Sequence, residues 1–209
     1  MKNLLAGYQR FRAHRWQEEK DVFESLAKTG QSPSALVISC IDSRVNPAMI
    51  FDAPPGEMLT VRNVANLVPP YAPDGAHHST SAALEFSVRV LEVRNIIVMG
   101  HSSCGGVKAL LDGAPPHAQE FIGPWMAIAE AARVRSRACS SREEGQTCAE
   151  HEVIKVALKN LMTFPWIAES VASGKLALHG VWFDVGKGEL LLLQPDGSFA
   201  PPQSGARQS

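Results

Sequence analysis

The sequence predicts an α/β fold with a mainly parallel sheet of four strands, one antiparallel edge strand and helices on both faces. Short apolar runs rich in β-branched residues alternate along the chain with longer segments whose apolar residues recur at helical spacing. This alternation is typical of parallel sheets whose strands are joined by helices. Two glycines in the short segment 184–188, between the last two apolar runs, predict a hairpin that adds the antiparallel edge.

The same patterns place the individual elements. Residues 3–27 have a repeating apolar face that includes Leu4, Tyr8 and Phe11, which predicts an amphipathic helical arm broken near His14. The predicted strands are 35–41, 58–61, 95–100, 176–183 and 189–193. The predicted helices are 79–93, 105–111, 121–137 and 147–164.

Length and composition favour a single globular domain. The chain has 209 residues, of which 45% are hydrophobic and 20% charged, so we expect one domain with an arm (1–27), a core (28–195) and a tail (196–209). A net charge of -1 gives no basic surface for nucleic acid or membranes. The start of the sequence has no signal-peptide pattern, and we expect a cytoplasmic protein. We also expect the four cysteines to be reduced.

Three potential metal ligands stand out within the motifs CIDSR and HSSCGG. Cys40 ends the first predicted strand, and His101 and Cys104 follow the third. Ligand sites of open α/β sheets lie at the carboxyl ends of strands, so these side chains can share one site. Thiolate and imidazole groups suit zinc. Three protein ligands leave a fourth position free, as in catalytic zinc sites, and predict one zinc ion per chain.

Two other functions fit the same residues. Cys40 could act as a thiolate nucleophile on an anionic substrate that Arg44 binds. Alternatively, Asp42 could complete the zinc site, and the protein would be a zinc-stabilised interaction module without catalysis, whose arm docks on a partner. Zinc content separates the first alternative from a zinc enzyme, and an activity assay separates the second.

The motifs CIDSRV, RNVANLVPPY (62–71) and GHSSCGGVK (100–108) together resemble the β-class carbonic anhydrases, especially the plant-like branch, over residues 28–195. The resemblance implies a lyase that reversibly hydrates CO2 to bicarbonate and a proton. It assigns zinc to Cys40, His101 and Cys104, and it places Asp42 and Arg44 as a dyad beside the metal. Zinc would lower the pKa of a bound water so that hydroxide attacks CO2.

The resemblance also implies substrate-binding residues and an assembly. It assigns Gln31, contributed by a neighbouring subunit, and Gly105 to substrate binding, and it places Leu59, Val64 and Phe86 on the apolar pocket for CO2. Relatives often carry Phe and Tyr where this chain has Leu59 and Phe86. The basic unit of the relatives is a dimer, so we expect a homodimer or a higher even-numbered homo-oligomer in which the arm packs on a neighbouring subunit.

Two weaker signals concern a second metal cluster and a regulatory site. Cys139, Cys148 and His151 could form a second metal cluster, although ordinary thiols at a helix start are the simpler interpretation. Some relatives bind regulatory bicarbonate through a Trp, an Arg and a Tyr. This chain keeps the arginine, Arg62, but has other residues at the remaining two positions, and we expect that inhibitory site to be missing.

Overall fold

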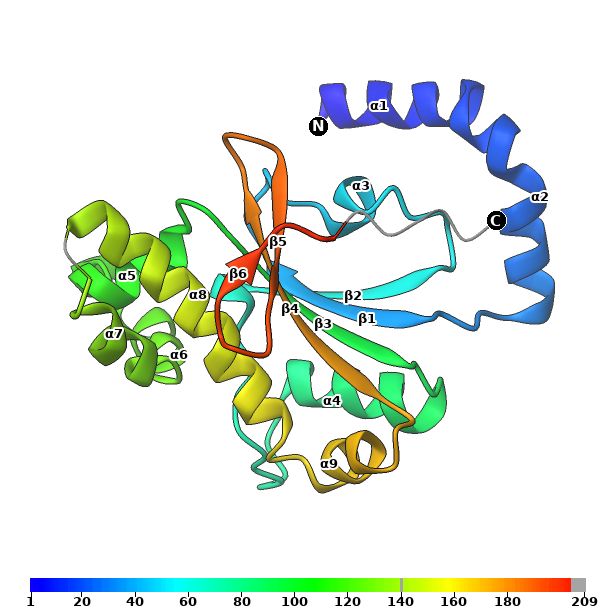
Figure 1. Ribbon diagram of the computed structural model, residues 1–209. Helices are drawn as coiled ribbons and strands as arrows, with labels where there is room; N and C mark the ends of the chain where they lie inside the picture. Colours follow the sequence, from blue (N-terminus) through cyan, green and yellow to red (C-terminus); the bar gives the residue numbers. More distant parts are fainter. Residues whose placement is uncertain (140, 204–209) are drawn as a thin grey trace.

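The computed structural model describes residues 1–139 and 141–203, and its centre is a six-stranded sheet (Figure 1). The strand order is β2-β1-β3-β4-β5-β6. The first four strands in this order are parallel, and β5 pairs antiparallel with both β4 and β6. The strands are β1 (Ala35–Cys40), β2 (Met58–Asn63), β3 (Asn95–His101), β4 (Ala177–Asp184), β5 (Glu189–Leu193) and β6 (Phe199–Ala200).

This architecture confirms the predicted α/β fold, although several elements differ from the predicted ones. The α-helix expected over 79–93 ends at Glu85, the helix expected over 147–164 spans Arg142–Leu161, and the helices Pro47–Ile50 and Pro165–Ala172 were not predicted. Strand β6 lies in the segment expected to be a tail, and the helix expected over 121–137 is two helices, α6 and α7. The helices are α1 (Lys2–Ala13), α2 (Arg15–Thr29), α3 (Pro47–Ile50), α4 (Ser79–Glu85), α5 (Gly105–Asp112), α6 (Ile122–Ala127), α7 (Glu130–Ser136), α8 (Arg142–Leu161) and α9 (Pro165–Ala172).

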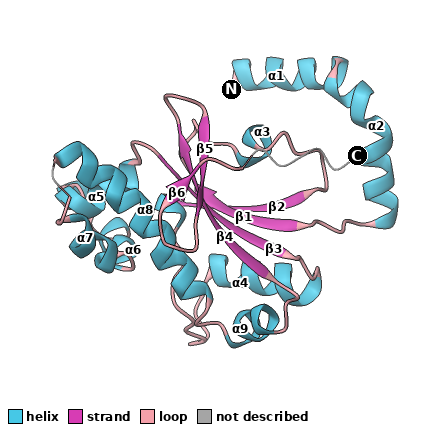
Figure 2. Ribbon diagram, viewed as in Figure 1, coloured by secondary structure: helices cyan, strands magenta, loops and turns pink. Residues whose placement is uncertain are grey.

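Helices cover both faces of the sheet and divide the core into two clusters (Figure 2). Val37 of β1 packs on one face with residues of α5 to α8, whereas Leu36 and Ile38 pack on the other face with residues of α4, α8 and α9. Every residue of β1 is therefore buried, as expected for a central strand of a parallel sheet. Cys40 ends this strand inside the first cluster.

Helix α8 contacts the backbone of the sheet through two glycines. A Cβ atom added at Gly100 of β3 or at Gly180 of β4 would lie 2.8 Å from a side-chain carbon of Ile154. Ile154 is fully buried on α8. The absence of side chains at these two positions lets the helix approach β3 and β4 closely, directly beside His101.

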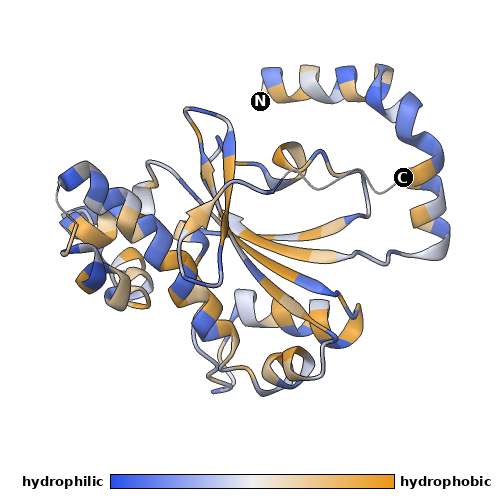
Figure 3. Ribbon diagram, viewed as in Figure 1, coloured by the Kyte–Doolittle hydropathy of each residue, from blue (hydrophilic) through white to orange (hydrophobic). Residues whose placement is uncertain are grey.

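Helices α1 and α2 form an arm outside the sheet, and apolar residues run along both helices (Figure 3). No residue of these two helices, both described in full, is buried. The side chains of Leu4 and Tyr8 are 76% and 60% exposed. None of the helices in the described segments is long and apolar enough to span a membrane.

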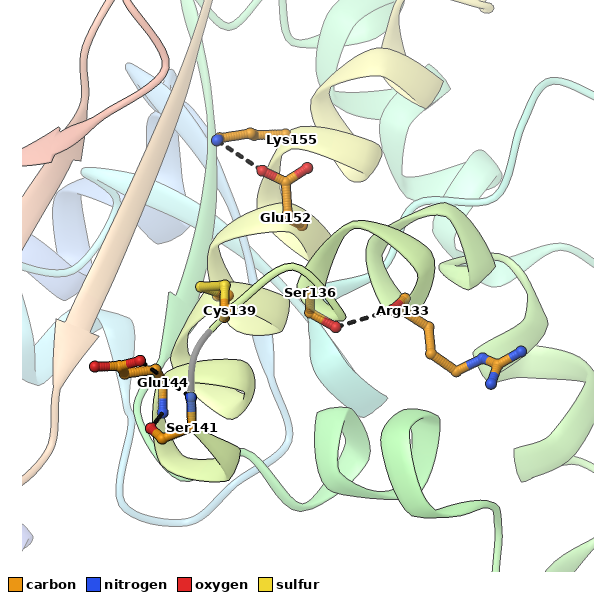
Figure 4. Close-up of a disulfide and its surroundings, with 8 residues drawn as sticks. Arg133, Ser136, Cys139, Ser141, Glu144, Glu152 and Lys155 are labelled. Carbon is orange, nitrogen blue, oxygen red and sulfur yellow. Dashed lines mark hydrogen bonds and ion pairs between the residues drawn. A yellow bond between two sulfur atoms is a disulfide. The ribbon is translucent and has the colours of Figure 1, made fainter.

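The prediction of four reduced cysteines is wrong for one pair, because Cys139 and Cys148 form a disulfide (Figure 4). The pair joins the segment after α7 to the start of α8, and these two helices pack against each other. The chain reverses between the helices, and the Cα atoms of Cys139 and Cys148 lie 6.9 Å apart. The possible second metal cluster is also excluded, because both sulfurs are bonded and His151 stacks on Phe199.

Candidate metal centre

The sheet topology places three potential ligands together. Strands β1 and β3 are parallel neighbours, and Cys40 and His101 are their last residues. The chain then turns through Ser103, whose φ of 56° is left-handed, and this turn brings Cys104 back toward His101. The ligand atoms of Cys40, His101 and Cys104 all lie within 4.8 Å of one another, and the two sulfurs are 3.9 Å apart.

The imidazole of His101 is oriented as a metal ligand. Its Nδ1 lies 2.9 Å from the carbonyl oxygen of Ser102, which can only accept, so Nδ1 carries the proton. The Nε2 atom of the neutral ring then has a free lone pair. Nε2 is buried and has no hydrogen-bond partner among the described residues. A buried lone pair beside two thiols fits a zinc ion, because this donor set is one that zinc prefers.

Cys40, His101 and Cys104 shift one another's pKa values. A hydrogen bond from the Cys104 thiol lowers the pKa of Cys40, although burial opposes this shift. The same contact with Cys40, together with burial, raises the pKa of Cys104. Burial disfavours the imidazolium of His101, but its contact with Cys40 raises its pKa. One thiolate is thus favoured here, and a divalent cation would favour the ionisation of both.

Asp42 and Arg44 form an ion pair at the edge of the ligand cluster. The guanidinium binds the carboxylate in a bidentate manner, with Nε 2.9 Å from Oδ1 and Nη2 2.7 Å from Oδ2. These hydrogen bonds hold the pKa of Asp42 well below its usual range. Oδ2 is 4.0 Å from Nε2 of His101, so the carboxylate lies beside the cluster while Arg44 binds it.

Comparison with known proteins decides the family. A family model described as carbonic anhydrase matches residues 35–190. Beta carbonic anhydrase 3 of Arabidopsis thaliana is 39% identical over 208 residues, which cover 96% of this chain and 80% of the relative. The chain belongs to the β-carbonic anhydrase family. It is therefore a carbonic anhydrase, a lyase.

Other relatives of this β-carbonic anhydrase agree with that assignment. The mitochondrial beta carbonic anhydrase 6 of Arabidopsis thaliana is 39% identical over 84% of this chain, which spans 61% of that relative's length. The structure of the beta-carbonic anhydrase CcaA is 34% identical, with a TM-score of 0.91, and the match covers 97% of this chain and 99% of CcaA. Two tetrameric beta-carbonic anhydrases of Sordaria macrospora were also solved; the matching chain is 28% identical, with a TM-score of 0.81, over 95% of this chain and 98% of its own. Because relatives include a mitochondrial protein, the cytoplasmic location stays a prediction.

The substrate-binding residues implied by the resemblance are dispersed in a single chain of this β-carbonic anhydrase. Val64 packs on the core cluster that contains Cys40, whereas Leu59 packs on the cluster of the opposite face. Gln31 is exposed, and Phe86 is 50% exposed. Gly105 is exposed at the start of α5, next to Cys104.

Arg62 fixes the backbone that carries the dyad of this β-carbonic anhydrase. Its guanidinium donates to the carbonyl oxygens of Cys40, Asp42 and Val45 at 3.0, 2.6 and 3.0 Å. The family resemblance linked Arg62 only to a regulatory anion site. Its position on β2, directly beside β1, explains the role that the structure shows.

Gln146 and Glu150 of α8 also contact the ligand segment and were missed. The backbone N–H of Cys104 donates to Oε1 of Glu150 at 3.0 Å. The sequence separation of 46 residues hides this contact. A signal was present, because Glu150 lies at helical spacing from the apolar Ile154 and Ala157, and a carboxylate on an apolar helix face needs a polar partner.

Proposed function

We propose that this β-carbonic anhydrase binds one zinc ion per chain through Cys40, His101 and Cys104 and reversibly hydrates CO2 to bicarbonate and a proton. The observation that carries the proposal is the buried, unpartnered Nε2 of His101 beside two thiols. A zinc ion held by three protein ligands supplies a Lewis acid that makes water nucleophilic near neutral pH. The membership in the family supports CO2 as the substrate.

In this proposal, Asp42 orients the attacking water and Arg44 controls Asp42. An ionised carboxylate accepts a hydrogen bond, and the pKa of Asp42 lies low enough to keep it ionised at neutral pH. If released, the same carboxylate could take the fourth zinc position and block water. Arg44 prevents this, because its fork binds both oxygens of Asp42 and its Nη2 also donates to the carbonyl oxygen of Ser103 at 3.1 Å.

We further propose that a second copy of the chain completes the active site. Gln31 and Phe86 are exposed, and Leu59 packs on the far face of the sheet from the ligand cluster. The exposed apolar face of the arm supplies a surface that a second copy would cover. The solved tetrameric relatives support a homodimer or a higher even-numbered assembly.

The experiment that tests the function combines elemental analysis with stopped-flow measurement of CO2 hydration on the purified full chain. We expect about one zinc per chain and rapid hydration. Protein that binds zinc but does not accelerate hydration would support a non-catalytic zinc module instead. Protein without zinc whose Cys40 alkylates rapidly would support a thiolate nucleophile.

A further inference from the structure

Helix α8 holds both polar groups of the Cys104 backbone. The N–H of Cys104 donates to Oε1 of Glu150 at 3.0 Å, and Nε2 of Gln146 donates to the Cys104 carbonyl oxygen at 3.1 Å. Gln146 also donates to Oε1 of Glu150 at 2.9 Å, which joins the two side chains. The indole Nε1 of Trp182 donates to Oε2 of Glu150 at 3.1 Å.

Glu150 is in a fixed and buried position. Its side chain is among the largest that are fully buried, with 2% of the residue exposed. A buried carboxylate is costly unless hydrogen bonds satisfy it, and Glu150 receives bonds from Cys104, Gln146 and Trp182. Ile154, one helical turn further along α8, packs directly against Gly100 of β3. This packing places Glu150 against the turn that carries Cys104.

We propose that Glu150, together with the hydrogen-bonded Gln146, is a positioning residue that sets where the Cys104 sulfur lies relative to Cys40 and His101. This inference rests on the proposed zinc function, because it assigns a role to α8 in shaping the metal site. Cys104 has the extended backbone that precedes α5, so the hydrogen bonds to its N–H and carbonyl oxygen fix its peptide planes. Loss of such outer-shell contacts typically weakens metal binding by about 10- to 100-fold.

Replacement of Glu150 by Gln tests this role at nearly constant volume. A carboxamide has one accepting oxygen and one donating nitrogen. If its oxygen faces Cys104, its NH2 group faces the donating indole of Trp182; if it is flipped, the NH2 group faces the N–H of Cys104. Either arrangement places two donors together. The additional replacement Trp182→Phe removes the indole donor and allows the carboxamide oxygen to serve Cys104 again.

The experiment measures metal binding by the full chain after its metal is removed. Zinc affinity is measured by competition with a chromogenic chelator, and Co2+ is added to record the thiolate-to-cobalt charge-transfer absorption. The variants are Glu150→Gln, Gln146→Met and Glu150→Gln with Trp182→Phe. Glu152→Gln is the matched control, because Glu152 also lies on α8 but pairs with Arg135 and Lys155, away from Cys104.

We expect Glu150→Gln and Gln146→Met to bind zinc about 10- to 100-fold more weakly and to shift the cobalt absorption, whereas the Glu152→Gln control keeps wild-type values. The double variant should regain most of the lost affinity. Wild-type affinity and absorption in folded Glu150→Gln and Gln146→Met proteins would overturn the inference. If the wild-type chain binds zinc tightly but does not hydrate CO2, the proposed function fails while the positioning role stands.

Discussion

Arg44 determines the state of Asp42, the carboxylate beside the ligand cluster. The fork of hydrogen bonds from Arg44 is the main cause of the low pKa of Asp42. We expect Arg44→Ala to lower the turnover of CO2 hydration by roughly 100-fold or more, because it frees the carboxylate. Bound zinc should stay near one equivalent per chain. Stopped-flow hydration and elemental analysis of the same sample check both parts.

Arg44→Lys and Arg89→Ala are informative controls for this prediction. Lysine keeps the charge at position 44 but lacks the planar fork, so its turnover should stay well below the wild-type value. Arg89 pairs with Glu85 on the surface, and its removal should leave turnover unchanged. Wild-type turnover in Arg44→Ala would show that the dyad has no gating role.

Burial of His151 predicts a dependence of the stability of the fold on pH. Burial lowers its pKa to about 4, from an ordinary value of 6.5, because the charged form is penalised. Between these two values the unfolded chain binds the proton and the folded chain does not. The contribution is therefore fully present above pH 6.5 and is lost as the pH falls toward 4.

We expect His151→Phe to reduce this pH dependence. Phenylalanine keeps the aromatic contacts with Phe199 and Trp182 but cannot bind a proton. Between pH 7 and pH 5, the wild-type free energy of unfolding should fall by about 1–2 kcal/mol more than that of the variant. Urea unfolding at the two pH values measures the difference. Equal pH dependence in both proteins would exclude His151 as the titrating group.

At the scale of residues, the sequence predicts the potential metal ligands better than it predicts the residues that hold these ligands in place. The sequence identifies the potential ligands Cys40, His101 and Cys104, because few other roles require two thiols and an imidazole after neighbouring strands. Glu150 supports Cys104 from a distant helix, and only the packing of α8 on the sheet brings them together. Sequence periodicity marks Glu150 as an unusual charge on a buried face, but it does not name the partner.

At the scale of elements, the disulfide stabilises the start of α8. It closes a loop between positions separated by 9 residues. Replacing both Cys139 and Cys148 by Ser should lower the free energy of unfolding by about 2–3 kcal/mol, because the unfolded chain regains the entropy of that loop. Chemical denaturation with zinc bound measures this change.

A reductant provides the control for the disulfide prediction. A dithiol reductant should lower the stability of the wild-type protein toward that of the double variant and should leave the double variant unchanged. An equal effect of the reductant on both proteins would mean that it acts by removing bound zinc and not by reducing the disulfide. No effect on either protein would contradict a stabilising disulfide.

The differences between the predicted and the observed elements have local physical causes. Helix α8 begins at Arg142 rather than Thr147 because Ser141 and Glu144 form a capping box before the apolar pattern starts. Strand β6 is two residues long and forms only by pairing with β5, which no local pattern reveals. The strands of the parallel sheet were predictable because a continuous run of β-branched residues is typical of a strand that is buried on both faces.

At the scale of the whole molecule, a single chain leaves the apolar residues of the arm uncovered. The apolar residues Leu4, Leu5 and Tyr8 of α1 are all more than half exposed. Burying one such side chain contributes about 1.5–3 kcal/mol. We expect replacement of all three by Ser to weaken self-association at least about tenfold, which analytical ultracentrifugation measures.

Val134→Ser provides a comparison for the arm variant. Val134 is also an exposed apolar residue, but it lies on α7 rather than on the arm, and its replacement should leave self-association unchanged. Wild-type self-association in the triple arm variant would mean that the arm does not form the interface. The assembly itself could not be derived from residue patterns, because an amphipathic helix shows only that something covers it.

We infer that Cys40, His101 and Cys104 hold one zinc ion that is required for CO2 hydration. The most direct test titrates metal-free protein with zinc and follows hydration by stopped flow. We predict that activity rises linearly and stops rising at about one zinc per chain, and that Cys104→Ser protein gains little activity over the same range. A metal-free protein with full activity, or no activity at saturating zinc, would contradict the account.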